Sequence, residues 1–219
     1  MPCFQAEIVG KGCPVYTVVV LKRGADSPLV AAAKQWVLEK YPYNSYHLLN
    51  ALEWLDRIAP GSPEAVRLAT LTHDMERAFP GPDQPVMKSL ADPEYHAAHS
   101  ARSARIVGEW LRAQGTGDPL TGQVEALIRV HEDGGWPEAN LVQAADSLSF
   151  LDCNIDLFLS KVREGKWTAA DVRIKFDYSY HRIQAPGAKE LALPMLERAL
   201  ARLSALESEL SKRRTTTHV

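Results

Sequence analysis

A helix-start signal recurs along this chain, in which Ser or Asp stands directly before Pro. The Ser or Asp side chain accepts a hydrogen bond from a free backbone N–H of the first turn, and Pro at the first helical position needs no backbone partner. The signal occurs at Ser27-Pro28, Ser62-Pro63, Asp92-Pro93 and Asp118-Pro119. Apolar residues follow it at helical spacing. The chain is therefore expected to form one helix after another.

We expect helices over most of the chain from residue 27 onward. Their predicted ranges are 28–40, 63–78, 92–111, 118–130, 137–162, 168–183 and 188–212, with a further helix that has His47 in its first turn. Pro194 has no backbone N–H to donate and is expected to interrupt and kink the last helix.

The N-terminal segment has a different composition. Residues 15–21 are rich in β-branched side chains and are flanked by Gly and Pro, which is typical of a strand or hairpin, or of a disordered extension. One strand cannot form a sheet alone, so this segment is placed outside the core. We predict an all-α protein with an N-terminal extension over 1–26, one helical domain over 27–212 and a polar tail over 213–219.

The charge balance argues against a nucleic-acid polymer or a membrane as partner. The 25 Lys and Arg residues against 27 Asp and Glu residues give a net charge of −2, so no global positive field draws the chain to polyanions. The longest apolar run, 15–21, is far shorter than the ~20 residues of a membrane-spanning helix. No secretory signal is recognisable, and the three cysteines form no Cys-x-x-Cys pair. We expect a cytoplasmic protein.

Histidine and aspartate side chains lie beside apolar neighbours in several predicted helices. They are His47, His73, Asp74, His99, His131 and Asp146. Burying the charge of Asp146 without a partner would lose several kcal/mol of hydration, and a divalent cation is an effective partner. Imidazole and carboxylate suit Fe, Mn, Zn, Co or Ni. These residues are therefore candidate metal ligands.

The order His47, then His73-Asp74, then Asp146 resembles the HD superfamily of metal-dependent phosphohydrolases. His99 and His131 match the branch in which further histidines hold a second metal ion, with His96, one helical turn before His99, as the alternative. The resemblance implies an HD-type helical bundle. It also implies two divalent transition-metal ions per chain, Fe or Mn before Zn, Co, Ni or Mg, with Asp74 bridging them.

The resemblance implies a hydrolase that cleaves a phosphate ester of a small nucleotide or phosphorylated metabolite through a metal-activated water, with Asp74 as the catalytic carboxylate. The subfamily stays open, because Met75 and Glu76 follow His73-Asp74 where the cyclic-dinucleotide phosphodiesterases of the superfamily have Gly-Lys. The alternative is a mixed-valent di-iron oxygenase acting on a small hydroxylated or phosphonate substrate, since some members of the superfamily use the same six ligands for that chemistry. A third class is a regulatory sensor without turnover.

An anionic substrate needs cationic donors. Lys175, Tyr178 and Arg182 stand at i, i+3 and i+7 of the predicted 168–183 helix, so they share one face. Arg102 follows His99 by one turn. We expect these four residues to contact the substrate, with Arg77 and other charged residues near the His-Asp motif as lesser candidates. The alternative for each is a solvated charged face.

Overall fold

A computed structural model describes residues 26–90 and 92–216, and this part of the chain is helical without a β-strand. The helices are α1 (Pro28–Lys40), α2 (Ser45–Ile58), α3 (Glu64–Thr72), the 3-10 helix η1 (Met75–Ala78), α4 (Pro93–Ala113), α5 (Asp118–Arg129), α6 (Pro137–Cys153), α7 (Ile155–Arg163), α8 (Ala169–His181) and α9 (Ala188–Thr216). The all-α prediction is confirmed. The predicted N-terminal extension lies outside the described residues, apart from its last residue.

Side-chain caps explain several of the helix starts. The Ser27 hydroxyl accepts a hydrogen bond from the Val30 N–H, and the Asp92 carboxylate accepts from the N–H groups of Glu94 and Tyr95. Thr168 and Asp171 form a reciprocal capping box at α8. The expected Ser62 cap is absent, because the Ser62 hydroxyl donates to the Ala59 carbonyl instead and the helix begins at Glu64.

Two predicted helices are interrupted, and both interruptions correct the sequence prediction. The expected 63–78 helix ends at Thr72, and His73-Asp74 forms a turn before η1. There the His73 ring forms a hydrogen bond with the Thr70 carbonyl oxygen. In a continuing helix, that oxygen would accept a hydrogen bond from a backbone N–H instead. The expected 137–162 helix divides into α6 and α7 at Asn154.

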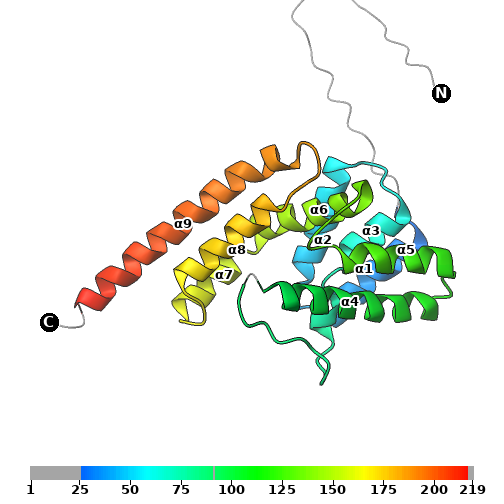
Figure 1. Ribbon diagram of the computed structural model, residues 1–219, viewed down its shortest axis with the longest axis horizontal. Helices are drawn as coiled ribbons and strands as arrows, with labels where there is room; N and C mark the ends of the chain where they lie inside the picture. Colours follow the sequence, from blue (N-terminus) through cyan, green and yellow to red (C-terminus); the bar gives the residue numbers. More distant parts are fainter. Residues whose placement is uncertain (1–25, 91, 217–219) are drawn as a thin grey trace, which may run out of the picture.

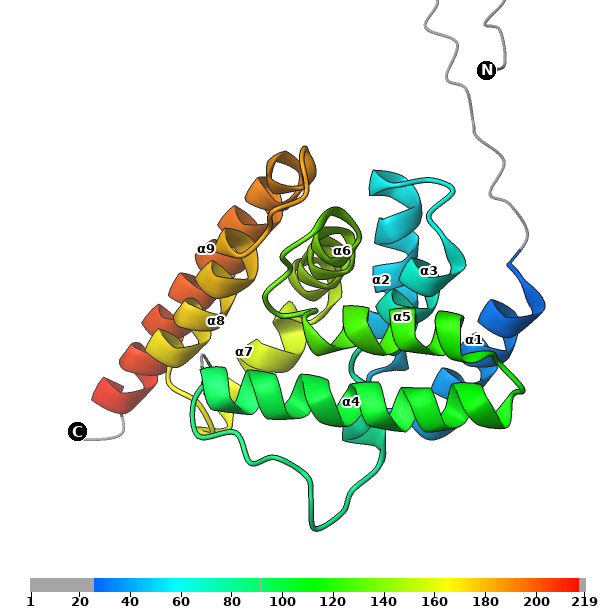
Figure 2. The same cartoon turned by 45° about the vertical axis from the view of Figure 1, so that its right-hand side comes forward.

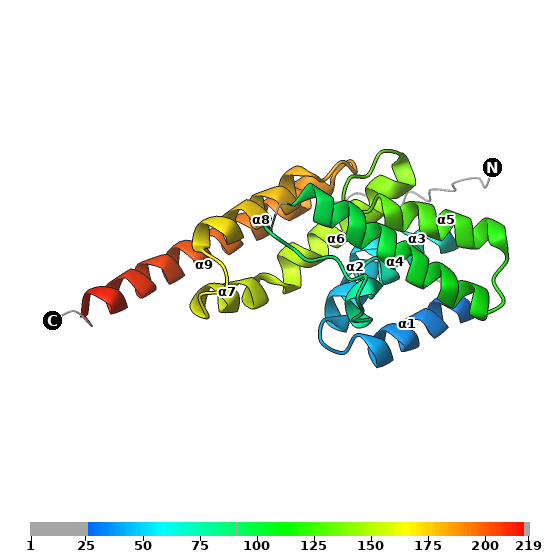
Figure 3. The same ribbon diagram turned by 60° about the horizontal axis from the view of Figure 1, so that its bottom comes forward.

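The last helix corrects two further expectations. Pro194 lies near the N-terminal end of α9, and the helix continues through it. The helix also runs to Thr216, so the first residues of the predicted 213–219 polar tail are helical. In Figure 3, α9 extends past the other helices toward the C-terminus. Within the described residues, no helix is both long and apolar enough to cross a lipid bilayer.

The helices form two hydrophobic cores that meet at α6. The first core gathers apolar side chains of α1 to α5, and the second gathers those of α7 to α9. Helix α6 supplies Val142 and Ala145 to the first core, and Leu148 and Leu151 to the second. Figures 1 and 2 both show α6 between the two groups of helices.

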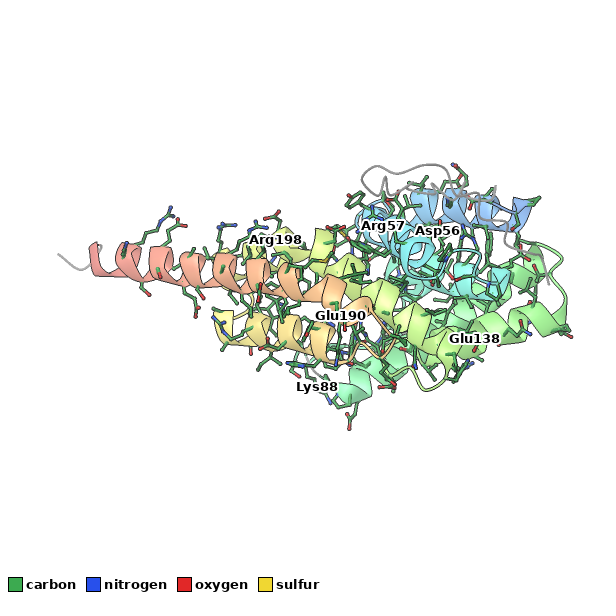
Figure 4. All side chains as sticks on the ribbon, turned by 90° about the horizontal axis from the view of Figure 1, so that it is seen from above. Asp56, Arg57, Lys88, Glu138, Glu190 and Arg198 are labelled. Carbon is green, nitrogen blue, oxygen red and sulfur yellow. The ribbon has the colours of Figure 1, made fainter. Side chains whose placement is uncertain are left out.

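Charged residues cover the outside of both groups of helices. Lys88, Glu138, Glu190 and Arg198 are exposed and project from the surface in Figure 4. Other ionisable groups are buried instead, around the middle of α6.

Candidate metal centre

The structure brings all six histidine and aspartate candidates into one buried cluster. They come from five places: the first turn of α2 (His47), the turn between α3 and η1 (His73 and Asp74), α4 (His99), the turn after α5 (His131) and α6 (Asp146). The most accessible of them, Asp146, is 6% exposed. Segments far apart in the sequence therefore meet at one point.

One group of ligand atoms gathers around Asp146. Its Oδ1 lies 3.1 Å from His47 Nε2 and 3.4 Å from His73 Nε2. Metal–ligand bonds to these atoms are about 2.0–2.2 Å long, so two atoms bound to one ion are at most about 4.2 Å apart. His47, His73 and Asp146 thus satisfy the spacing for one metal ion.

A second group gathers around His99 and His131, whose Nε2 atoms are 3.2 Å apart. Glu132 joins them, with Oε1 4.0 Å from His99 Nε2 and 3.8 Å from His131 Nε2. Glu132 is not among the ligands that are predicted from the sequence. The available signal was a carboxylate directly after a candidate histidine at a helix end.

Asp74 lies between the two groups. Its Oδ1 is 3.3 Å from His99 Nε2 and 4.0 Å from His73 Nε2. Asp74 also forms a group with His73 and His131 in which all ligand atoms lie within 4.8 Å of one another, so its carboxylate could serve more than one ion. His96 is not in the cluster, because its Nδ1 lies 3.4 Å from the Tyr178 hydroxyl. The structure therefore brings His99, and not His96, to the ligand position.

Each cluster histidine engages its outer ring nitrogen, Nδ1, with an oxygen outside the ligand set. The pairs are His47 with Ser149 Oγ (2.9 Å), His73 with the Thr70 carbonyl (2.9 Å), His99 with Glu76 Oε1 (3.3 Å) and His131 with the Ile128 carbonyl (2.8 Å). Such hydrogen bonds fix the orientation of each ring, so that Nε2 faces the centre of the cluster with its lone pair available. The buried His73 Nε2 has no hydrogen-bond partner. This is the arrangement expected of histidines that bind a metal.

Cationic side chains neutralise the cluster carboxylates. Arg182 binds both Asp146 and Glu132, and Arg77 Nη1 lies 3.3 Å from Asp74 Oδ2. Burial alone would raise the pKa of each carboxyl group. The positive charge of the neighbouring arginines outweighs burial and holds all three pKa values below their usual range. For the two aspartates, His73 also lowers the pKa. The three carboxylates are therefore ionised, as metal ligands must be.

Two of the imidazoles have opposite pKa shifts. Burial and the charge of His73 lower the pKa of His131 to about 3, so His131 is neutral. Burial also opposes the charged form of His73, but Asp146 and Asp74 outweigh it and raise its pKa to about 9. The carboxylates around His73 Nε2 therefore favour a positive charge at this point of the cluster, and a metal cation bound there would displace the proton.

A cavity of about 260 Å³ opens above the cluster, and His47, Asp74, Glu132 and Asp146 reach it. Its other walls are chemically divided. Arg77, Lys175 and Arg182 are cationic, whereas Tyr41, Tyr43, Met87, Leu90, Phe150, Leu157 and Phe158 are aromatic or aliphatic. The cavity can accept a small molecule with an anionic part and an apolar part.

Two of the three residues that were predicted on one face of helix α8, Lys175 and Arg182, line the cavity. Lys175 Nζ lies 5.5 Å from the ring centroid of Phe150 and 5.2 Å from that of Tyr178, and within the described residues it forms no ion pair. Arg182 faces the cluster carboxylates. Tyr178 does not line the cavity; its hydroxyl donates to Glu132 Oε2 at 3.3 Å.

Arg102 is not brought to the cavity, which corrects the prediction that it contacts substrate. Its guanidinium donates to the carbonyls of Glu76 (2.8 Å) and Phe79 (2.7 Å) and to Asp83 (2.9 Å). Arg102 follows His99 by three residues, so at about 100° per residue it points about 60° away from it around the helix. Arg102 therefore holds the loop after η1 against α4.

Comparisons of the chain with protein-family models, curated proteins and solved structures found no match. Membership of the HD superfamily therefore stays a prediction, and a function for this chain has to be argued from the geometry of the cluster and its cavity.

Proposed function

We propose that this protein is a metal-dependent phosphohydrolase of the HD type that cleaves a phosphate ester of a small anionic molecule, such as a nucleotide or phosphorylated metabolite. One observation carries the proposal: four histidine Nε2 atoms and three carboxylates converge beneath a cavity that is also lined by Lys175, a cation that pairs with no acidic group among the described residues. Metal ligands and an anion-binding group thus face the same space.

The residues present fit two divalent ions. His47, His73 and Asp146 would hold one, His99 and His131 the other, and Asp74 would contribute to both. When bound, such ions act as Lewis acids on a phosphoryl oxygen and lower the pKa of a water molecule toward neutrality. No Ser or Cys nucleophile is then required.

The remaining cavity residues orient the substrate. The Lys175 ammonium and the Arg77 and Arg182 guanidinium groups attract the phosphate by charge-assisted hydrogen bonds. Phe150, Phe158 and the other apolar side chains cover the rest of the molecule and keep bulk water away from it. Lys175 is the most available of the cations, because both arginines already pair with cluster carboxylates.

A second candidate is the di-iron oxygenase. It is favoured by the neighbouring groups of imidazole and carboxylate side chains, since imidazole suits iron and adjacent groups could hold a pair of iron ions. Phosphate and phosphonate carry similar charge, so the cations of the cavity serve either substrate class.

The test is metal analysis of anaerobically purified protein, followed by a panel of phosphate and phosphonate substrates. Phosphate release by the Mn²⁺-loaded protein without oxygen supports hydrolysis. Oxygen uptake that requires both iron and substrate, with no anaerobic turnover, overturns it in favour of oxygenation. Tight binding of metal without turnover on any substrate favours the sensor class.

A further inference from the structure

Glu132 is the cluster side chain that the HD resemblance does not assign. It is 5% exposed, and it follows His131 in the turn after α5. With it, the two ligand groups have the same composition: two histidines and one carboxylate, with Asp74 between them. Without it, the second group would have two histidines and only the carboxylate it shares with the first.

We propose that Glu132 is a ligand of the second metal ion, bound through Oε1 beside His99 and His131. This inference rests on the proposed function only in requiring that the cluster binds metal. It gives each ion a carboxylate of its own.

The spacing of the three residues supports this role. The distances among His99 Nε2, His131 Nε2 and Glu132 Oε1 are 3.2, 3.8 and 4.0 Å. All lie within the ~4.2 Å limit for two atoms on one ion. The arrangement needs no movement of the backbone to bring the three atoms to a common centre.

The two oxygens of Glu132 have different surroundings. Oε2 accepts hydrogen bonds from Arg182 and from the Tyr178 hydroxyl. Oε1 faces the two imidazoles. Arg182 and Tyr178 thus fix the carboxylate through Oε2 and leave Oε1 directed into the cluster. Ligating carboxylates are commonly held by such hydrogen-bond partners.

Glu76 provides the contrast. It is also buried, at 1% exposed, and also close to His99. However, its Oε1 contacts the outer nitrogen of that ring, Nδ1, at 3.3 Å, and its other oxygen pairs with Arg102. Glu76 therefore supports a ligand, whereas Glu132 lies on the ligand side of the same ring.

The experiment is a titration of the metal-free 219-residue chain with Co²⁺. Binding is monitored by the visible spectrum of the Co²⁺ ion and by calorimetry. Glu132→Gln removes the charge of the oxygen while keeping its shape, and we expect the second ion to bind at least ~tenfold more weakly. Asp133→Asn is the matched control, because it makes the same change in the adjacent carboxylate, which is exposed and outside the cluster. It should bind two ions as tightly as wild type.

Three results would overturn the assignment. They are an unchanged second-ion affinity in Glu132→Gln, an equal loss in Asp133→Asn, which would mean that any lost negative charge near the cluster weakens binding, and a loss of turnover with both ions retained. If Glu132→Gln does not fold, a crystal structure of the Mn²⁺-loaded wild type decides. Oε1 should lie within about 2.0–2.2 Å of an ion, and a carboxylate turned away from both ions excludes the role.

The outcome is separable from that of the proposed function. Wild type that binds two ions but hydrolyses nothing refutes the hydrolase and leaves the Glu132 assignment to the titration. Wild type that hydrolyses phosphate esters, with Glu132→Gln binding both ions normally, refutes only the Glu132 assignment.

Discussion

The floor and the wall of the cavity are built in different ways. We call the floor the seven side chains of the buried cluster, His47, His73, Asp74, His99, His131, Glu132 and Asp146, and the wall Lys175 of α8 and Arg182 at the C-terminal cap of that helix. The floor lies at most 6% exposed, and each imidazole is fixed by a hydrogen bond at Nδ1. On the wall, the Lys175 ammonium lies near the rings of Phe150 and Tyr178 and forms no ion pair within the described residues. The floor is therefore held in an arrangement that could bind metal ions, whereas the wall includes a cation that no described acidic group neutralises by direct contact.

The two parts also belong to different cores. Except for Asp146, the floor comes from α2 to α5 and their connecting turns, which surround the first core, and the wall comes from α8 in the second. Helix α6 joins the two and carries Asp146, which Arg182 binds. Metal binding and substrate binding should therefore respond to different substitutions.

The largest effect is expected from Asp74→Ala in the floor. Because this carboxylate lies between both ligand groups, the variant should lose most of its bound metal and all measurable turnover. Metal analysis and a phosphate-release assay measure the two losses. Asp152→Ala, which removes a carboxylate of α6 outside the cluster, should keep both ions. Full metal content and normal rate in Asp74→Ala would refute the metal centre.

The next effect concerns the number of ions held by the floor. Wild type should bind about two ions per chain, and His99→Ala or His131→Ala should bind about one, because each substitution removes half of the imidazoles of the second group. His96→Ala should still bind two, since its ring contacts Tyr178 instead. A count controlled by His96, or a wild-type count of one, would contradict the assignment.

A smaller effect is expected from Lys175→Ala in the wall. The variant should keep its metal but raise KM for an anionic substrate by about tenfold or more, because a charge-assisted hydrogen bond contributes about 1.5–3 kcal/mol. Steady-state kinetics and metal analysis together make the measurement. Arg173→Ala is the control on the same helix, since Arg173 pairs with Glu207 of α9 away from the cavity. Equal KM values for the two variants would contradict a substrate contact at Lys175.

The smallest effect on the site is expected from Arg102→Ala. Loss of its bonds to the Glu76 and Phe79 carbonyls should lower the free energy of unfolding by about 1–3 kcal/mol. Metal content and KM should stay near wild-type values, because the side chain does not reach the cavity. Denaturant unfolding checks the first expectation and kinetics the second. A large rise in KM at unchanged stability would restore Arg102 as a substrate contact.

Helix starts and candidate ligands were largely predictable because both depend on local chemistry. The Ser27 and Asp92 caps act within one turn of their own helix, and the six His and Asp candidates all reached the cluster. The break at His73-Asp74 was not predictable, because apolar spacing continues through it as far as Met75. There the His73 side chain competes for a backbone carbonyl, and helical periodicity carries no signal for that competition.

The sequence by itself determined the all-α class and the residue types available for metal binding, since capping and hydrophobic periodicity act over a few residues. Only the tertiary structure decided which side chains share a space. It selected His99 over His96, excluded Arg102 from the cavity and added Glu132, because Glu132 meets Arg182 from α8 across fifty residues of sequence. Ligand geometry depends on distances of a few ångströms between helices, and those distances are set by the packing of the two cores around α6.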